Sequence, residues 1–265
     1  MHQCLFAQAG NCQYKWRWQA ACAALQLCSM TSERIFADRA SAGVALGREL
    51  QRRLLKPPVL VLGLPRGGVP VAYELAQMLN APLDVMLVRK IGMPGLPELA
   101  IGAIASGNIM VHRPPLGKEV PAETFNRLVK EQRRELERRE QIYRAGRRTL
   151  ELKGKTVILV DDGLATGSTM LAAVRAARKA HAAAIVVTAP VASREAADLV
   201  RAEADSLVIL QTPAVLFAIG EWYEHFEQLE DEDVNRLLAR ANLRNLTPGR
   251  SAAARRDDRD RWLFR

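Results

Sequence analysis

The stretch Val157–Thr169, VILVDDGLATGST, combines an apolar run, two adjacent carboxylates and a series of small or hydroxyl-bearing residues. The apolar run ends at Val160 and predicts a strand, and the residues from Ser168 onward predict a helix. In an open α/β sheet, ligands bind beyond the carboxyl ends of the strands. The order of strand, polar loop and helix therefore predicts a ligand site at the tip of a sheet strand.

The loop between this strand and this helix suits a phosphorylated sugar. A helix start preceded by small residues presents unpaired N–H groups and the positive end of the helix dipole to an anion. Thr166, Ser168 and Thr169 add hydroxyl donors. Asp161 and Asp162 would repel that anion but suit the hydroxyls of a neighbouring pentose, or Mg²⁺. Together they favour a ribose 5-phosphate over an ordinary aspartate-capped junction.

Apolar runs alternate with helical patterns on both sides of this stretch. Strands are predicted at residues 59–64, 83–88, 157–160, 185–191 and 207–210, and a hairpin at 101–105 and 109–111. Helices are predicted at residues 69–79, 122–143, 168–180, 195–203 and 231–241, and a further helix opening near residue 31 with a Ser or Thr cap. This alternation is typical of an α/β fold in which a parallel sheet is buried between helices.

The two ends of the chain differ in composition from residues 30–246, which we interpret as one domain. All four cysteines lie in the first 28 residues, and their spacing matches no zinc pattern. Residues 1–29 are expected to be a disordered or non-native extension, because Gln26 interrupts the apolar run that a signal peptide would need. Residues 247–265 are expected to be a disordered basic tail.

The bulk properties limit the classes of function. The formal net charge is +9, of which residues 1–29 carry +2 and residues 247–265 carry +3. Because the domain itself is only mildly basic and shows no nucleic-acid-binding motif, we do not expect a nucleic-acid partner. No apolar run is long enough to cross a bilayer, and a core without cysteine fits the cytoplasm.

VILVDDGLATGST resembles the phosphoribosyl-pyrophosphate motif of the type I phosphoribosyltransferases, and the resemblance extends over about residues 36–241. It implies a five-stranded parallel sheet with helices on both faces, a small hood that holds the acceptor, and Mg²⁺-assisted transfer from 5-phosphoribosyl-1-pyrophosphate to a nitrogenous base. Asp161 and Asp162, at the surface of the site, would bind the ribose hydroxyls and Mg²⁺, directly or through water. The 5-phosphate would be held by Ala165, Thr166, Gly167, Ser168 and Thr169, and Gly163 would also contact the substrate.

A second glycine-rich loop, LPRGGV at residues 64–69, follows the first predicted strand. Gly67 and Gly68 leave backbone N–H groups open to an anion, and Arg66 can pair with phosphate oxygens. The alternative is a glycine turn that serves packing. In the resembled family this position is the pyrophosphate loop, often with a strained peptide bond.

Residues 88–102, VRKIGMPGLPELAIG, are expected to form a long irregular loop because they contain three glycines and two prolines. The resemblance makes this the flexible loop that closes over the pyrophosphate, and RKIGMPG is similar to the loop of adenine phosphoribosyltransferases. Arg89 and Lys90 would then neutralise leaving-group charge as catalytic residues, and Glu98 could act on the acceptor. Lys90 could also be a solvated charge, and Glu98 a surface acid.

The acceptor is less well defined. Ala165 stands where hypoxanthine-guanine enzymes of the resembled family carry an aspartate, which disfavours a 6-oxopurine. The hood would comprise residues of about 112–150 and 212–228, in which Trp222 and Tyr223 could stack on a base or simply pack. The charge-rich helix at 122–143 could extend the hood, form the contact of a homodimer, or present a solvated face.

Three functions fit these features. The first is a phosphoribosyltransferase, favoured because both phosphate-binding loops are complete. The second is a regulatory protein that binds phosphoribosyl pyrophosphate without turnover. The third is hydrolysis or phosphorolysis of a ribosylated metabolite at the same site.

Overall fold

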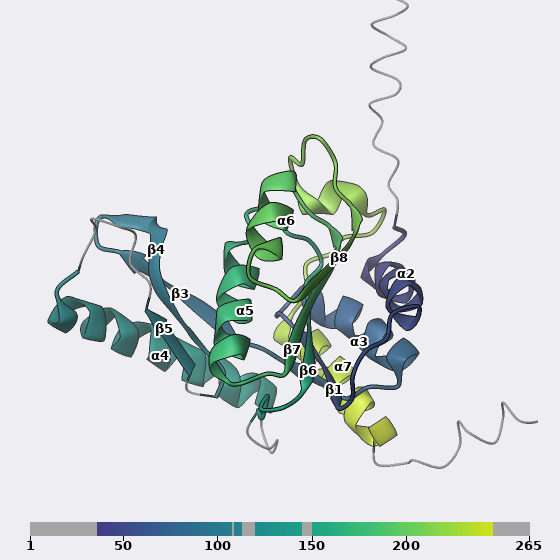
Figure 1. The fold of residues 1–265 in the computed structure, drawn as a ribbon, viewed down its shortest axis with the longest axis horizontal. Coiled ribbons are helices and arrows are strands. Elements are labelled where there is room, and N and C mark those ends of the chain that lie inside the picture. The colour runs from purple at the N-terminus through teal and green to yellow at the C-terminus, as the bar shows by residue number, and fades with distance from the viewer. Residues whose placement is uncertain (1–35, 108, 113–119, 145–149, 246–265) are drawn as a thin grey trace, which may run out of the picture.

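The central layer of the computed structural model is a five-stranded parallel sheet. The structure describes residues 36–107, 109–112, 120–144 and 150–245. The strands of this sheet lie in the order β2-β1-β6-β7-β8, and every pairing between them is parallel (Figure 1). Their bounds are Val59–Gly63 for β1, Leu83–Val85 for β2, Thr156–Val160 for β6, Ala184–Val191 for β7 and Ser206–Gln211 for β8.

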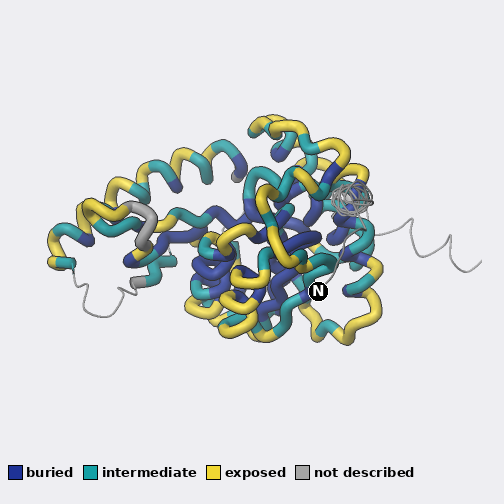
Figure 2. Tube along the Cα trace, turned by 90° about the horizontal axis from the view of Figure 1, so that it is seen from above, coloured by how far each residue is buried: buried dark blue, intermediate teal, exposed yellow. Residues whose placement is uncertain are grey.

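Helices cover both faces of this sheet, as Figure 1 shows. On one face lie α2 (Arg39–Gln51), α3 (Gly68–Leu79) and α7 (Asp231–Asn245), and on the other lie α5 (Ser168–Lys179) and α6 (Arg194–Arg201). Each face has its own apolar cluster, and all five residues of β6 are buried. The dark core of Figure 2 follows these strands. The predicted fold class is therefore confirmed.

A second unit extends to one side of the central sheet (Figure 1). Its antiparallel sheet consists of β3 (Val88–Met93), β4 (Leu96–Ala105) and β5 (Ile109–His112), in that order. The long helix α4 (Ala122–Arg144) lies along this sheet. Its buried side chains join the apolar cluster that also holds Ile91 and Ile101 of the antiparallel strands.

The prediction of a long irregular loop at residues 88–102 is wrong, because most of these residues form the β3–β4 hairpin. Met93 pairs with Leu96 across a two-residue turn of Pro94 and Gly95. Gly95 has a φ of +78°, and proline followed by such a glycine is the usual composition of a type II turn. The prolines and glycines therefore mark a tight turn and a register shift at Gly92, and not a long loop.

Two predicted boundaries also differ. The strand expected at residues 83–88 ends at Val85, and Val88 begins a strand of the other sheet. The first described helix begins at Arg39, where the side chain of Asp38 accepts the N–H of Ser41 at 2.7 Å. The Ser and Thr considered as caps near residue 31 lie outside the described residues.

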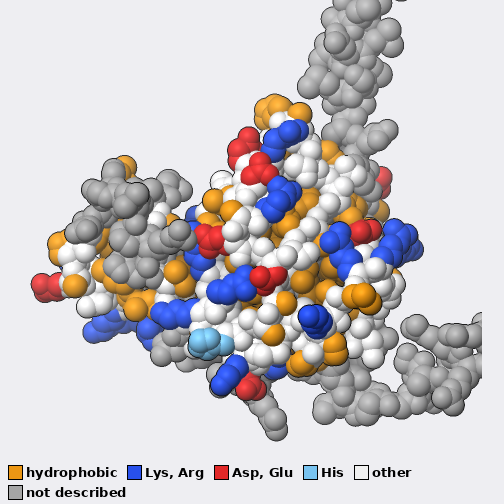
Figure 3. All heavy atoms as spheres, viewed as in Figure 1, with side chains coloured by type: hydrophobic (Ala, Val, Ile, Leu, Met, Phe, Trp, Pro, Cys, Tyr) orange, Lys and Arg blue, Asp and Glu red, His pale blue; other side chains and the backbone are white. Residues whose placement is uncertain are grey.

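The surface carries mixed charge. On the face drawn in Figure 3, Lys and Arg side chains are interspersed with acidic and uncharged groups and form no continuous basic patch. Among the described residues, none of the helices has the length and apolar character needed to span a bilayer.

We expect Gly43→Ala to destabilise the protein, because Gly43 lets α2 lie close to α3. A Cβ at this position would be 2.5 Å from the carbonyl oxygen of Val71 and 2.9 Å from the Cβ of Glu74. Overpacking costs about 1–3 kcal/mol of unfolding free energy, and contacts this close to a backbone oxygen and a Cβ put the cost above the helix preference of alanine over glycine, which is about 1 kcal/mol. Chemical denaturation measures the change, with exposed Arg48→Ala on the same helix as the control. Stability equal to or above that of the wild type would contradict the close packing.

Candidate functional site

Two loops leave the same edge of the central sheet and meet. Because β1 and β6 are parallel neighbours whose last residues are paired, the loops that follow them start side by side. A Cβ at Gly67 would lie 1.8 Å from Oδ2 of Asp162, and one at Gly68 would lie 2.5 Å from the carbonyl oxygen of Val160. Glycine is needed where backbone approaches so closely. The structure thus brings the loop at residues 64–69 against the acid pair.

The two carboxylates at the end of β6 are partly buried, whereas we expected them at the surface of the site. The Asp162 side chain is 13% exposed, and its Oδ2 accepts a hydrogen bond from Nε of Arg39 at 2.9 Å. Asp161 Oδ1 accepts the backbone N–H of Asp162 at 3.0 Å. Burial, with the neighbouring Asp162 charge, raises the pKa of Asp161 well above its ordinary value. Burial also raises the pKa of Asp162, although Arg39 opposes that rise.

Arg39, the first residue of α2, is a site residue that the sequence did not reveal. Besides its bond to Asp162, its Nη1 donates to the carbonyl of Glu227 at 3.0 Å, and its guanidinium lies 3.7 Å from the centre of the Phe226 ring. The side chain is 11% exposed. Because 123 residues separate Arg39 from Asp162, no local pattern could have indicated the pair.

The loop after the acids ends at an open helix start. Gly167 adopts a φ of +68° and caps α5 without a side-chain hydrogen bond of its own. The N–H of Ser168, the first residue of the helix, makes a long hydrogen bond of 3.4 Å to the Thr166 hydroxyl, and the positive end of the helix dipole faces this loop. Thr166 and Ser168 share a hydrogen bond of 2.8 Å between their hydroxyls. Ala165 and Thr169 are exposed, whereas Gly163 lies against Ile219.

The predicted leaving-group residues lie on β3. Nζ of Lys90 is 3.4 Å from Oγ of Ser168, so the antiparallel sheet reaches the loop at residues 165–169, which is predicted to hold a phosphate and is called the phosphate loop below. Arg89 donates from Nε and Nη2 to Oε1 of Gln132 on α4, at 3.1 and 3.0 Å. Glu98 belongs to β4, but its side chain lies outside the described part of the structure, so its role stays a prediction.

Tyr223 occupies a position that differs from the predicted base-stacking role. It is 2% exposed, and its ring packs between Phe36 and Phe226, with centroid distances of 5.7 and 4.9 Å. Its hydroxyl donates to the backbone carbonyl of Asp162 at 2.6 Å. A buried ring cannot stack on a ligand, so Tyr223 supports the acid pair from behind. Trp222 is half-buried beside this cluster, and its role stays a prediction.

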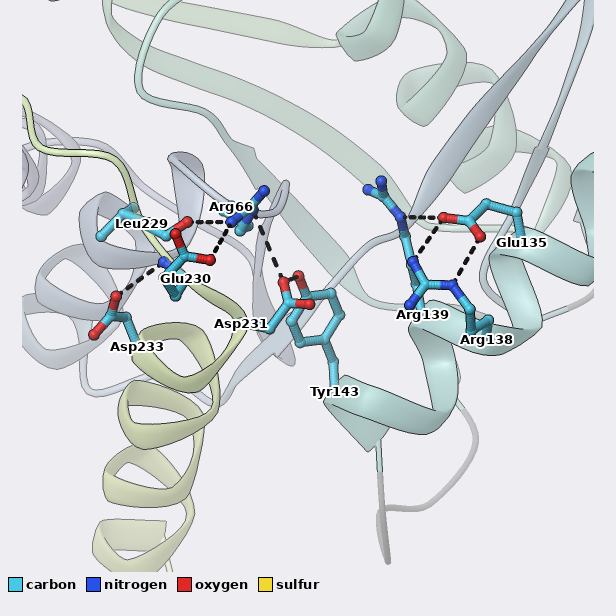
Figure 4. Close-up of polar contacts among 9 residues, drawn as sticks. All are labelled: Arg66, Glu135, Arg138, Arg139, Tyr143, Leu229, Glu230, Asp231 and Asp233. Carbon is cyan, nitrogen blue, oxygen red and sulfur yellow. Dashed lines mark hydrogen bonds and ion pairs between the residues drawn. The ribbon is translucent and has the colours of Figure 1, made fainter.

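Arg66, in the loop at residues 64–69 that we call the glycine loop, is bound by residues at the start of α7, as Figure 4 shows. Nη1 of Arg66 donates to the carbonyl of Leu229 and to Oε2 of Glu230, the latter at 3.2 Å, and its Nε is 3.8 Å from Oδ1 of Asp231. Asp231 also accepts the hydroxyl of Tyr143 from α4. The glycine loop, α4 and α7 therefore meet at one polar cluster. The peptide bond between Pro65 and Arg66 is cis.

An open cavity of about 420 Å³ lies beside these groups. It is lined by Arg39, Arg66, Gly67, Asp162, Phe226, Glu227, Gln228 and Leu229. Within the described residues, no three acidic, His or Cys side chains cluster closely enough to hold a metal ion by themselves. Any ion here would need ligands from a bound substrate as well as from the acid pair.

Comparison with known proteins agrees with this geometry. The family model for the phosphoribosyl transferase domain matches residues 45–224. A protein of Mycobacterium tuberculosis that carries the provisional name phosphoribosyl transferase Rv0571c is 41% identical over 211 residues, which cover 79% of this chain and 47% of that protein. The chain thus spans about half the length of the curated relatives it matches.

A solved structure matches at similar identity. The protein TT1426 from Thermus thermophilus is 42% identical, with 77% of this chain and 97% of that chain covered and a TM-score of 0.72. The family match covers both loops that the fold brings together at the tips of β1 and β6. The chain therefore belongs to the phosphoribosyl transferase family.

Proposed function

We propose that the chain is a Mg²⁺-dependent phosphoribosyltransferase that transfers the phosphoribosyl group of 5-phosphoribosyl-1-pyrophosphate to a nitrogenous base and releases pyrophosphate. The contact of Gly67 with the Asp162 carboxylate is the observation that supports this most. It puts acceptors for sugar hydroxyls directly against a loop suited to a diphosphate. An open helix start, suited to the 5-phosphate, lies at the far end of the acid loop.

Each part of the donor has a matching part of the site. Asp161 and Asp162 would accept hydrogen bonds from the ribose hydroxyls. The N–H groups of Ala165–Thr169 and of the α5 start would hold the 5-phosphate. The glycine loop around Gly67 would receive the pyrophosphate, whereas the N–H of Gly68 donates to the carbonyl of Leu64 at 3.0 Å and helps to close the loop.

The transfer needs charge neutralisation more than a covalent nucleophile. The bond between ribose C1 and the pyrophosphate oxygen breaks with its electron pair on the leaving group, while a ring nitrogen of the base bonds to C1 and any proton on that nitrogen passes to solvent. Positive charge develops on the sugar and negative charge on the leaving group. Lys90, already beside the phosphate loop, and Arg89 are the cations of β3 that would stabilise the leaving group.

The donor set of the site fits Mg²⁺. Adjacent carboxylates and substrate phosphates are the ligands that Mg²⁺ combines in proteins, and Asp161 and Asp162 would hold it directly or through water. When bound, the ion would neutralise phosphate charge. A cytoplasmic homodimer is part of this proposal and rests on the sequence alone.

The acceptor class is open. Ala165 is exposed at the loop and offers no side-chain base, which favours acceptors other than 6-oxopurines. Arg66 is already bound to Leu229 and Glu230, and this favours one alternative, a regulatory protein that binds the donor without turnover. In that case the polar cluster at the start of α7 would have to open for binding, without a catalytic step.

Incubation with 5-phosphoribosyl-1-pyrophosphate, Mg²⁺ and a panel of purines, pyrimidines and other heterocycles should release pyrophosphate with at least one base. A coupled pyrophosphate assay measures the release, and omission of the base is the control. Release without any base would indicate hydrolysis. Donor binding without release on the whole panel would favour the regulatory alternative and contradict the transferase.

We expect Asp161→Asn to weaken donor binding without weakening the fold. In the variant, an amide NH₂, which is a donor, replaces a carboxylate oxygen that would accept a hydrogen bond from a ribose hydroxyl. The loss of one charged hydrogen bond corresponds to about a tenfold to hundredfold weaker affinity. Calorimetry with the donor measures this, and unchanged affinity would reject the assignment of Asp161 to the ribose.

The free energy of unfolding of Asp161→Asn should rise or stay the same, even though its donor affinity falls. The pKa of Asp161 is raised in the folded state, so its ionisation opposes folding above the ordinary pKa of an aspartate, and this cost vanishes as the pH falls below that value. The variant should therefore be at least as stable as the wild type at neutral pH, with a difference that shrinks in acid. Denaturation at several pH values checks the trend.

Arg39→Gln should move the pH dependence of donor binding. The variant removes the guanidinium that opposes the rise in the pKa of Asp162, so this pKa rises further and the carboxylate is lost at a higher pH as the solution is acidified. The acid limb of the binding profile, followed by calorimetry, should shift to higher pH. Arg48→Gln, exposed on the same helix, is the control. Superimposable profiles for the wild type and Arg39→Gln would refute the coupling.

A further inference from the structure

We propose that Arg139, on the long helix α4, is a donor-binding residue that acts with Arg89 on the pyrophosphate group. This proposal rests on the proposed function, because it assigns a further contact to the same donor. Neither the loop motifs nor the family match points to Arg139.

The first argument is position. A small cavity of about 30 Å³ lies where the glycine loop, the phosphate loop, β3 and α4 come together. Besides Met86–Val88, its lining residues are Leu64, Pro65, Arg89, Leu136, Arg139 and Thr169. The space holds about one water molecule, and therefore one phosphate oxygen rather than a whole phosphate group. Two arginines thus border a small space next to the two loops proposed to bind phosphate groups.

The second argument is the pattern of α4. Phe125, Val129, Leu136 and Tyr143 are all at most 8% exposed and form the buried face of the helix. Helical spacing places residues 132 and 139 on this same face, where Gln132 and Arg139 interrupt the apolar series. The Arg139 side chain is 38% exposed, so its stem follows the packing face while its guanidinium stays accessible at the edge of that face.

The third argument is orientation. Gln132 accepts two hydrogen bonds from Arg89, and Glu135 accepts one from Nε of Arg139 at 2.9 Å. The bond to Glu135 uses Nε, and Figure 4 shows the two Nη nitrogens of Arg139 pointing away from that carboxylate. Arg138, by contrast, uses both Nε and Nη2 on Glu135, at 2.8 and 3.0 Å. One helix therefore orients both cavity arginines through neighbouring side chains.

The fourth argument is charge. Arg138 and Arg139 lower the pKa of Glu135 to about 2, so this carboxylate is ionised at neutral pH. Among these three side chains, one carboxylate faces two guanidinium groups, which is a net charge of +1, and Asp231 is a further acid that acts on Arg138. Arg89, which donates to the neutral Gln132, adds another positive charge. The local excess of positive charge matches a leaving group that gains negative charge as it departs.

The neighbouring arginines provide a matched pair for the test. Arg138 and Arg139 bind the same carboxylate, but only Arg139 is among the residues that line the cavity. Arg139→Gln and Arg138→Gln each remove one partner of Glu135, so a general effect on α4 should be similar in both. Arg139→Lys keeps the charge but loses the planar fork that fits phosphate oxygens.

Calorimetry with inorganic pyrophosphate, ribose 5-phosphate and the intact donor, each with Mg²⁺, is the measurement. We expect Arg139→Gln to bind pyrophosphate and the donor about tenfold to hundredfold more weakly, with ribose 5-phosphate affinity within about twofold of the wild type. Arg138→Gln should match the wild type for all three ligands, and Arg139→Lys should lie between the two.

Equal affinities for Arg139→Gln and Arg138→Gln would overturn the assignment of Arg139, and so would a parallel loss of ribose 5-phosphate binding. These outcomes differ from failure of the proposed function, in which the wild-type chain itself would bind neither the donor nor pyrophosphate. Denaturation of the three variants identifies any loss of binding that comes from unfolding. If Arg139→Gln does not fold, the pyrophosphate affinity of Arg139→Lys is the test, and an affinity equal to that of the wild type would overturn the assignment.

Discussion

The close contact between the glycine-loop backbone and the acid pair is the constraint on which the rest of the site depends. A Cβ at Gly67 would fall 1.8 Å from the Asp162 carboxylate, so any side chain there would displace the acid. The contact exists because β1 and β6 are adjacent and parallel, with their last residues in register. Two loops about a hundred residues apart in the sequence thereby form a single surface, which the proposed function assigns to a sugar that carries phosphate at both ends.

This arrangement buries two neighbouring acids, and the surrounding elements offset that cost. Arg39 supplies a cationic partner to Asp162, while Phe226 lies against the Arg39 guanidinium. The Tyr223 hydroxyl holds the backbone carbonyl of Asp162. The start of α2 and the segment around Tyr223 thus support the acids from behind. The unit formed by β3–β5 and α4 approaches the site from elsewhere, through Lys90 at the phosphate loop and Tyr143 near α7.

The central sheet could be predicted because continuous apolar runs report strands that are buried on both faces. Predicted strands therefore agree with β1, β6, β7 and β8 to within one residue at each end. The β3–β4 hairpin could not be recognised, since proline and glycine mark tight turns and long loops alike. Only the pairing of Met93 with Leu96 shows that two residues make the turn. The start of α2 was missed because several polar residues precede it, and any of them could have capped the helix.

The sequence by itself determined the chemistry of the two loops, because acids, glycines and hydroxyls that lie close together in the chain remain close together in the fold. Tertiary structure alone decided which residues from distant parts of the chain lie beside these loops. Arg39 reaches Asp162 across 123 residues, and α4 brings Arg139 to a cavity between loops that precede and follow it in the chain. It also decided that Tyr223 packs inside. Such contacts depend on how helices pack against sheets, and local residue patterns do not predict that packing.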